Sequence, residues 1–176
     1  MEALVQKAIE RYGKIDILVN NAGISQRSLI KDTDFSVYKE LMDIDYLGTL
    51  VLSKALLPHF ITKKDGHYVT VTSLMGKFGS PFRSGYCGAK HALHGFFDVM
   101  RMEHEKNHAG RALPQNQDDT ATLNGLSPNT AAKKIIRAIV RQKFEVYVGG
   151  GEVKGVYLKR FFPKLLHKVV LKSQVR

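Results

Sequence analysis

The chain has 176 residues, of which 44% are hydrophobic and 24% charged, so we expect one soluble globular domain and exclude a disordered chain. Its single cysteine, Cys87, excludes an internal disulfide framework and a cluster of thiolate metal ligands. No apolar run approaches the roughly 20 residues that cross a bilayer, and the N-terminus lacks a signal-peptide pattern. A reducing compartment, the cytoplasm, is therefore the expected location.

The net charge of +11 is concentrated in the last third of the chain. Residues 1–108 carry 14 Lys and Arg against 12 Asp and Glu, a balance of +2, whereas residues 109–176 carry 13 against 4, a balance of +9. The chain has neither zinc-finger spacing nor an aromatic and basic RNA-binding signature. We therefore do not expect a nucleic-acid partner.

Helical and strand patterns alternate through the first two thirds of the chain. Residues 2–12 form a predicted amphipathic helix, and residues 15–19 form an apolar strand of the kind buried on both faces of a parallel sheet. A long helix is predicted over about 34–60, followed by a β-branched strand over 66–73. A Gly, Ser and Pro-rich loop then leads to a second long helix over about 86–106.

The remaining third is more polar. Residues 109–124 are rich in Asn, Gln, Asp and Thr and are predicted to be a loop. Ser127-Pro128 predicts the start of a helix that extends to about residue 142, because serine caps helices and proline suits their first position. A short strand over 145–148 and a glycine turn over 149–151 follow.

This alternation favours an α/β fold, specifically a partial Rossmann-like, doubly wound parallel sheet in a three-layer αβα arrangement. We divide the chain into a partial Rossmann-type domain over residues 1–151 and a basic amphipathic C-terminal segment over residues 152–176.

Three residues, Ser73, Tyr86 and Lys90, are candidates for acid/base catalysis. Tyr86 and Lys90 are four residues apart at the start of a predicted helix and therefore share a face. An ammonium beside a phenol lowers the pKa of the tyrosine from about 10, so that the phenol can exchange a proton with a carbonyl or alcohol oxygen. Ser73 ends a predicted strand, where its hydroxyl could bond the same oxygen. A surface Tyr–Lys pair and a turn-capping serine are the structural alternatives.

The order and spacing of these residues carry a family resemblance. Asn20-Asn21-Ala22-Gly23 follows an apolar strand, and Ser73 lies thirteen residues before the tyrosine of Tyr86-Cys87-Gly88-Ala89-Lys90. This ordered combination resembles the short-chain dehydrogenase/reductase family over about residues 3–108. The resemblance implies hydride transfer between NAD or NADP and a small-molecule carbonyl/alcohol pair, in which the cofactor supplies the redox chemistry.

The resemblance also implies a role for each matching residue. Tyr86 is then the catalytic acid/base, Lys90 lowers the pKa of Tyr86 and bonds the nicotinamide ribose, and Ser73 holds the substrate oxygen. The turn beside the cofactor is formed by Asn21, Ala22 and Gly23.

Three departures from the family pattern stand out. The Gly-rich turn TGxxxGxG is absent from the chain, so the chain as given is predicted to bind NADH or NADPH poorly. We expect Gly149–Gly151 to be an ordinary turn after a strand rather than a replacement for it. The strand that follows the catalytic helix in the family is predicted to be missing. Asp45 occupies a slot where many members place a water-holding asparagine, and its charge would oppose phenolate formation.

Four histidines, His91, His94, His104 and His108, share the second long helix, and the last two have the spacing of a metal pair. No third ligand accompanies them, so we expect solvent-facing histidines and no metal site.

The C-terminal segment combines an apolar stripe with seven Lys and Arg against one Glu over residues 152–176. Residues 153–176 could dock on the sheet, join a homo-oligomer interface, or lie on an anionic membrane surface as a peripheral helix. The alternative to an oxidoreductase is a catalytically silent fragment that acts as such a membrane-surface or interaction module.

Overall fold

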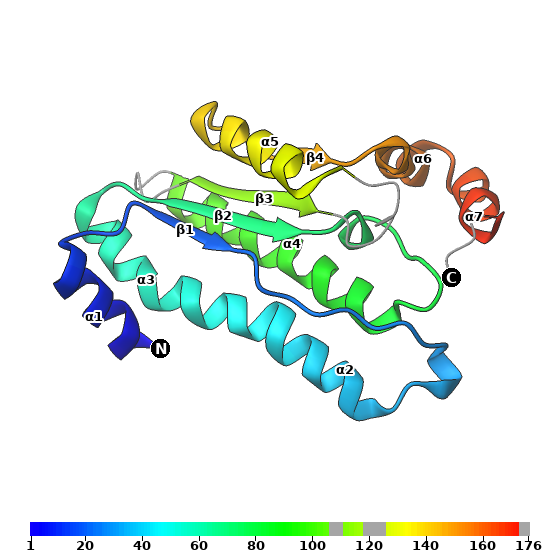
Figure 1. Ribbon diagram of the computed structural model, residues 1–176, viewed down its shortest axis with the longest axis horizontal. Coiled ribbons are helices and arrows are strands. Elements are labelled where there is room, and N and C mark those ends of the chain that lie inside the picture. The colour runs from blue at the N-terminus through cyan, green and yellow to red at the C-terminus, as the bar shows by residue number, and fades with distance from the viewer. Residues whose placement is uncertain (106–110, 118–125, 173–176) are drawn as a thin grey trace.

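The computed structural model describes residues 1–105, 111–117 and 126–172. Its centre is a four-stranded parallel sheet in the order β1-β2-β3-β4 (Figure 1). The strands are β1 Ile17–Asn20, β2 His67–Thr72, β3 Arg111–Gln117 and β4 Val146–Val148. The α-helices are α1 Glu2–Tyr12, α2 Phe35–Leu41, α3 Thr49–Lys63, α4 Ser84–Glu105, α5 Pro128–Val140, α6 Lys154–Phe161 and α7 Pro163–Lys172. The expected α/β fold is confirmed.

Helices cover both faces of the sheet. Figure 1 shows α1, α3 and α4 on one face and α5 on the other, where it lies over β3 and β4. The main core lies between α3, α4 and β2, where Phe60, Tyr68 and Phe97 are buried. The rings of Phe60 and Tyr68 pack edge to face with centroids 4.9 Å apart. Gly66 permits this packing, because a Cβ there would lie 2.2 Å from the Phe60 ring.

The strand β1 is less buried than its apolar sequence predicts. Its side chains alternate, so that Leu18 and Asn20 are the more buried, whereas Ile17 and Val19 are 46% and 51% exposed. The expectation of burial on both faces is therefore wrong for this strand. β1 is an edge strand of the sheet, and α5, on the second face, lies over β3 and β4 at the other edge. One face of β1 is therefore not covered by α5.

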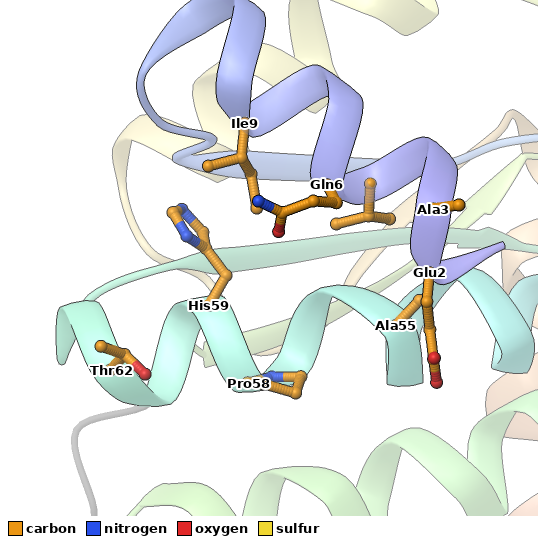
Figure 2. A pocket seen from close by; sticks show the side chains of 9 residues that line it. Glu2, Ala3, Gln6, Ile9, Ala55, Pro58, His59 and Thr62 are labelled. Atoms are coloured by element: carbon orange, nitrogen blue, oxygen red, sulfur yellow. The ribbon is translucent and has the colours of Figure 1, made fainter.

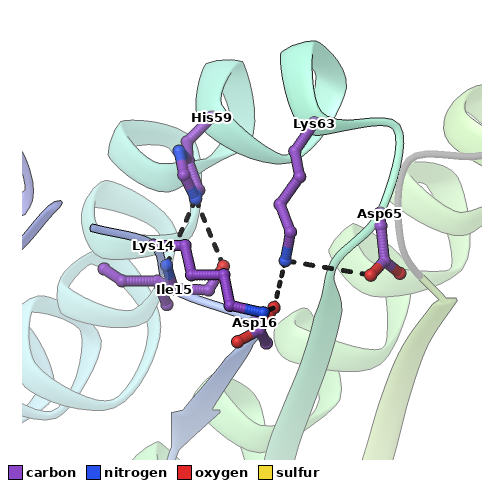
Figure 3. Close-up of polar contacts among 6 residues, drawn as sticks. All are labelled: Lys14, Ile15, Asp16, His59, Lys63 and Asp65. Carbon is purple, nitrogen blue, oxygen red and sulfur yellow. Dashed lines mark hydrogen bonds and ion pairs between the residues drawn. The ribbon is translucent and has the colours of Figure 1, made fainter. Parts of the chain in front are cut away.

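The start of β1 is held by polar contacts from α3, which Figure 3 shows. Nε2 of His59 lies 3.3 Å from the Ile15 amide nitrogen and 3.2 Å from its carbonyl oxygen. Lys63 forms an ion pair with Asp16, and Lys14 lies 3.2 Å from the same carboxylate. These two lysines, Lys63 above all, hold the pKa of Asp16 below its usual value.

The strand β3 corrects a second expectation. Residues 111–117, predicted as part of a loop and as the place of a missing strand, pair in parallel with β2 on one side and β4 on the other. The sequence did not predict this strand for two reasons. It is mostly polar, and Pro114 has no N–H to donate to a neighbouring strand. Residues 106–110 and 118–125, on which the rest of the loop prediction falls, lie outside the described residues.

The long helix predicted over 34–60 is a helical run from Phe35 to Lys63 whose middle part, Met42–Gly48, is a π-helix. Asp34 caps its start by accepting from the Ser36 N–H. Such wide turns often occur at functional sites. Among the residues that the structure describes, no helix is both long and apolar enough to cross a membrane.

Candidate functional site

Tyr86 and Lys90 lie in the first turns of α4 with their side chains in contact. Nζ of Lys90 is 5.5 Å from the centroid of the Tyr86 ring, and each residue is only 4% exposed. The spacing of four residues brings the two groups together, because residues one helical turn apart share a face. A phenol and an ammonium are thus held side by side inside the protein, where their interaction is weakly screened.

Asp45 joins this pair from the π-helix. Its Oδ2 lies 3.4 Å from Nζ of Lys90, and both side chains are buried. Its Oδ1 accepts a hydrogen bond of 2.7 Å from the Ile24 N–H, which fixes the turn after β1. Asp45 therefore balances the charge of Lys90 and ties the helix α4 to the turn.

The turn after β1 approaches Lys90 closely at Gly23. A Cβ at this position would lie 2.9 Å from Nζ of Lys90 and 3.2 Å from Oδ1 of Asp45, so a larger residue there would displace the Lys90 ammonium from its present place. Asn21 and Ala22 lie in the same turn with exposed side chains. Gly23 is thus the member of the predicted turn that the structure brings next to the Lys90–Asp45 pair.

Ser73 lies directly after β2 and is fully buried. Its Oγ accepts a hydrogen bond of 3.1 Å from the Met75 N–H and caps the 3-10 turn Leu74–Gly76. Leu74, Met75 and Tyr86 belong to one buried cluster, so the turn that Ser73 begins packs against the start of α4. An oxygen that accepts from a backbone N–H can still donate its own O–H.

Two further residues position this site, and sequence reasoning missed both. Asn20 donates from Nδ2 to Ser53 Oγ at 3.0 Å and to Thr70 Oγ1 at 3.3 Å, which links the end of β1 to α3 and β2. Gln26 is buried, and its Oε1 accepts from the N–H groups of Gly85 and Tyr86 at 2.8 and 3.3 Å. Gln26 therefore caps α4 at the turn that carries Tyr86.

No local pattern could have identified Gln26, because the amide groups that it binds are 59 and 60 residues away. Asn20 carried a partial signal as the first residue of the Asn20–Gly23 turn.

His94 departs from the prediction of solvent-facing histidines. It is buried one turn after Lys90, and its Nε2 lies 3.2 Å from Thr72 Oγ1. Its Nδ1 is 3.8 Å from a Glu145 oxygen that also pairs with Lys77 at 2.7 Å. Burial is the main cause that lowers the pKa of His94 to about 4. His108 lies outside the described residues, among which no group of three or more His, Cys, Asp or Glu side chains could hold a metal ion.

The glycine turn over 149–151 is closed by the chain itself. The Gly150 N–H donates to Glu152 Oε1 at 2.6 Å, and a Cβ on Gly149 would also meet that oxygen. A carboxylate thus occupies the place where a phosphate oxygen would have to bind. This supports the prediction of an ordinary turn after a strand.

A cavity of about 530 Å³ lies elsewhere, between α1 and α3 (Figure 2). Its lining includes Gln6, Ile9, Pro58 and His59, and contains none of Ser73, Tyr86 and Lys90. This cavity is therefore separate from the candidate site.

Comparisons with known proteins relate this chain to one family. A family model described as short chain dehydrogenase matches residues 1–109. The human protein Dehydrogenase/reductase SDR family member 7 is 50% identical over 102 residues, which cover 58% of this chain and 30% of that protein. Family member 7C of Xenopus tropicalis is 31% identical over 192 residues, covering 97% of this chain and 62% of that protein.

Two solved structures have folds similar to that of this chain. A short-chain dehydrogenase from Streptomyces avermitilis has the same fold, with a TM-score of 0.78 and 21% identity over 98% of this chain and 76% of that chain. ElxO with NADP bound has a TM-score of 0.63 and 27% identity over 65% of this chain and 46% of that chain. The chain spans between 30% and 62% of the length of the curated relatives it matches. On the family match, the chain belongs to the short-chain dehydrogenase/reductase family.

Proposed function

We propose that this chain carries the catalytic groups of a nicotinamide-dependent oxidoreductase that interconverts a small carbonyl compound and an alcohol, with Tyr86 as the acid/base. The observation that carries the proposal is the buried contact between the Lys90 ammonium and the Tyr86 ring, 5.5 Å from Nζ to centroid. Family membership supports the reaction class, and the NADP bound to the similar protein ElxO supports a nicotinamide cofactor.

The proton transfer follows from the side chains present. In the direction of reduction the Tyr86 hydroxyl donates a proton to the carbonyl oxygen, and in the direction of oxidation the phenolate accepts it back. The Lys90 charge stabilises the phenolate, and the Ser73 hydroxyl donates to the same substrate oxygen. Asp45, 3.4 Å from Lys90, reduces the net charge that Tyr86 experiences. Asp45 is thus a positioning residue in this scheme.

The residues fit one end of a nicotinamide cofactor. A bound NAD or NADP supplies or accepts the hydride. Lys90 would bond the ribose next to the nicotinamide, and the backbone of Asn21, Ala22 and Gly23 would lie beside it, since Gly23 brings this turn against Lys90. The 176-residue sequence contains no Gly-rich turn of the family type for the pyrophosphate, and the Gly150 N–H in the turn over 149–151 already donates to the Glu152 carboxylate.

The test uses this chain extended at its N-terminus by the Gly-rich strand–helix unit of a family member. Oxidation of NADH and NADPH is followed with a panel of aldehydes and ketones, and cofactor affinity is measured by fluorescence titration. We expect Tyr86→Phe to lower turnover by about 10²- to 10⁴-fold, since only the proton-transferring hydroxyl is lost, with cofactor affinity nearly unchanged. Lys90→Ala should lower both turnover and cofactor affinity.

Tyr68→Phe is the matched control, because Tyr68 is a buried tyrosine whose hydroxyl bonds the Ser53 carbonyl at 3.0 Å. This variant should keep full turnover. Retained turnover in Tyr86→Phe would refute the role of Tyr86. An extended chain that binds cofactor but turns over no carbonyl compound would favour the alternative, a catalytically silent module.

A further inference from the structure

The two C-terminal helices expose apolar side chains on one side and are anchored on the other. Leu166 is buried in the cluster that contains Phe78 and Tyr86, and Val156, Leu158 and Val170 pack against that cluster. Other side chains of α6 and α7, and that of Phe162 between them, face outward, with exposed fractions between 46% and 64%: Tyr157, Phe161, Phe162, Leu165, Val169 and Leu171. The helices are therefore docked and still present apolar groups to the outside.

Cations lie beside these apolar groups. Lys164, Lys168 and Lys172 recur every four residues and form a row along α7, and Leu165 and Val169 form a parallel row next to it. Residues 154–172 contain six Lys and Arg and no Asp or Glu. Among the described residues, none of these six cations forms an ion pair.

The charge selects among the partners that could cover this surface. A second copy of the chain, docked through the same surface, would bring the two lysine rows together, and like charges repel. A nucleic acid would neutralise the lysines and stack its bases on Phe161 and Phe162. However, it would leave the exposed aliphatic Leu165, Val169 and Leu171 without an apolar partner. An anionic bilayer satisfies both groups, because its headgroups attract lysines and its acyl boundary accepts aromatic and aliphatic side chains.

We propose that α6 and α7 bind the surface of an anionic membrane. Phe161, Phe162, Leu165 and Val169 enter the boundary between headgroups and acyl chains, and the row Lys164, Lys168 and Lys172 reaches the phosphates. The helices lie along the surface, and the opposite side of α7 keeps its contact with the protein through Leu166. This proposal is independent of the proposed catalytic function.

Sedimentation with lipid vesicles tests the electrostatic part on the 176-residue chain. Binding to phosphatidylcholine vesicles that contain phosphatidylserine should exceed binding to pure phosphatidylcholine and should weaken as salt rises. Lys164→Gln, Lys168→Gln and Lys172→Gln combined should lower the partition coefficient on the order of 100-fold. The control removes the same charge from exposed lysines elsewhere, with Lys7→Gln, Lys54→Gln and Lys133→Gln, and should change it by less than about threefold.

A single tryptophan tests insertion, because the chain contains none of its own. The fluorescence of Phe161→Trp should shift to the blue on anionic vesicles. That of Phe35→Trp, at a position that is 80% exposed and lies outside α6 and α7, should not shift. Circular dichroism verifies that each variant is folded. An unshifted Phe161→Trp spectrum overturns the proposal. So does a dimer in sedimentation velocity that Phe161→Ser with Phe162→Ser converts to monomer, since the surface then joins two copies.

Discussion

The interior around α4 and the outer surface of α6 and α7 depart from the usual distribution of side chains in opposite directions. Around α4, Asp45, Ser73 and Lys90 are buried, although charged and polar groups are ordinarily exposed. At the junction of α6 and α7, Phe161 and Phe162 are more than 60% exposed, although aromatic groups are ordinarily buried.

The two departures are stabilised differently. The buried polar groups each have a partner: Asp45 contacts Lys90 and the Ile24 N–H, and Ser73 accepts from the Met75 N–H. The exposed aromatic groups, by contrast, are not covered by other described residues of the chain, as their exposed fractions show. A buried polar cluster with internal partners is typical of a site that needs fixed geometry, whereas an exposed apolar patch indicates an external partner.

The largest expected effect comes from breaking the buried ion pair. Lys90→Met leaves the Asp45 carboxylate buried without its cation, so the free energy of unfolding should fall by about 3 kcal/mol or more. Lys39→Met breaks an exposed pair with Asp43, four residues away on the surface, and should cost about 0.5 kcal/mol or less. Urea unfolding measures both. Equal losses would show that the Lys90–Asp45 pair is solvated.

The second effect is a pH dependence that arises from His94. Burial lowers its pKa to about 4, whereas the unfolded chain keeps the ordinary value of 6.5, so the unfolded state binds the proton first as pH falls. The stability contributed by neutral His94 is complete above about pH 6.5 and is lost down to about pH 4. Between pH 7 and 5 the loss should be about 2 kcal/mol.

Urea unfolding at several pH values checks this expectation, and His94→Gln should flatten the curve over the same range. An unchanged pH dependence in that variant would assign the effect to other groups.

The smallest expected effect compares two helix caps. Gln26→Ala removes the buried acceptor of the Gly85 and Tyr86 N–H groups and should cost about 1–2 kcal/mol. Ser127→Ala removes an exposed cap of α5, which accepts from Thr130 at 3.2 Å, and should cost about 0.5–1 kcal/mol. Thermal and urea unfolding rank the two. If Ser127→Ala and Gln26→Ala lower the free energy of unfolding equally, the burial of Gln26 does not strengthen its cap of α4.

Much of the local structure could be predicted from the sequence, because it depends on near neighbours. Ser127-Pro128 predicted the start of α5, and the structure confirms Ser127 as its cap. The spacing of Tyr86 and Lys90 predicted that they share one face of a helix, and their contact agrees. The alternation of strand and helix predicted the parallel α/β fold, which needs only the order of the elements.

The tertiary structure decided what depends on distant partners. Asp45 and Gln26 gain their places from groups 45 and about 60 residues away, and β3 forms through pairing on both sides despite a polar sequence with a proline. His94 is buried because α4 packs against β2 and Glu145 comes near it. Periodicity reports which residues share a face of an element, and only packing determines what that face meets.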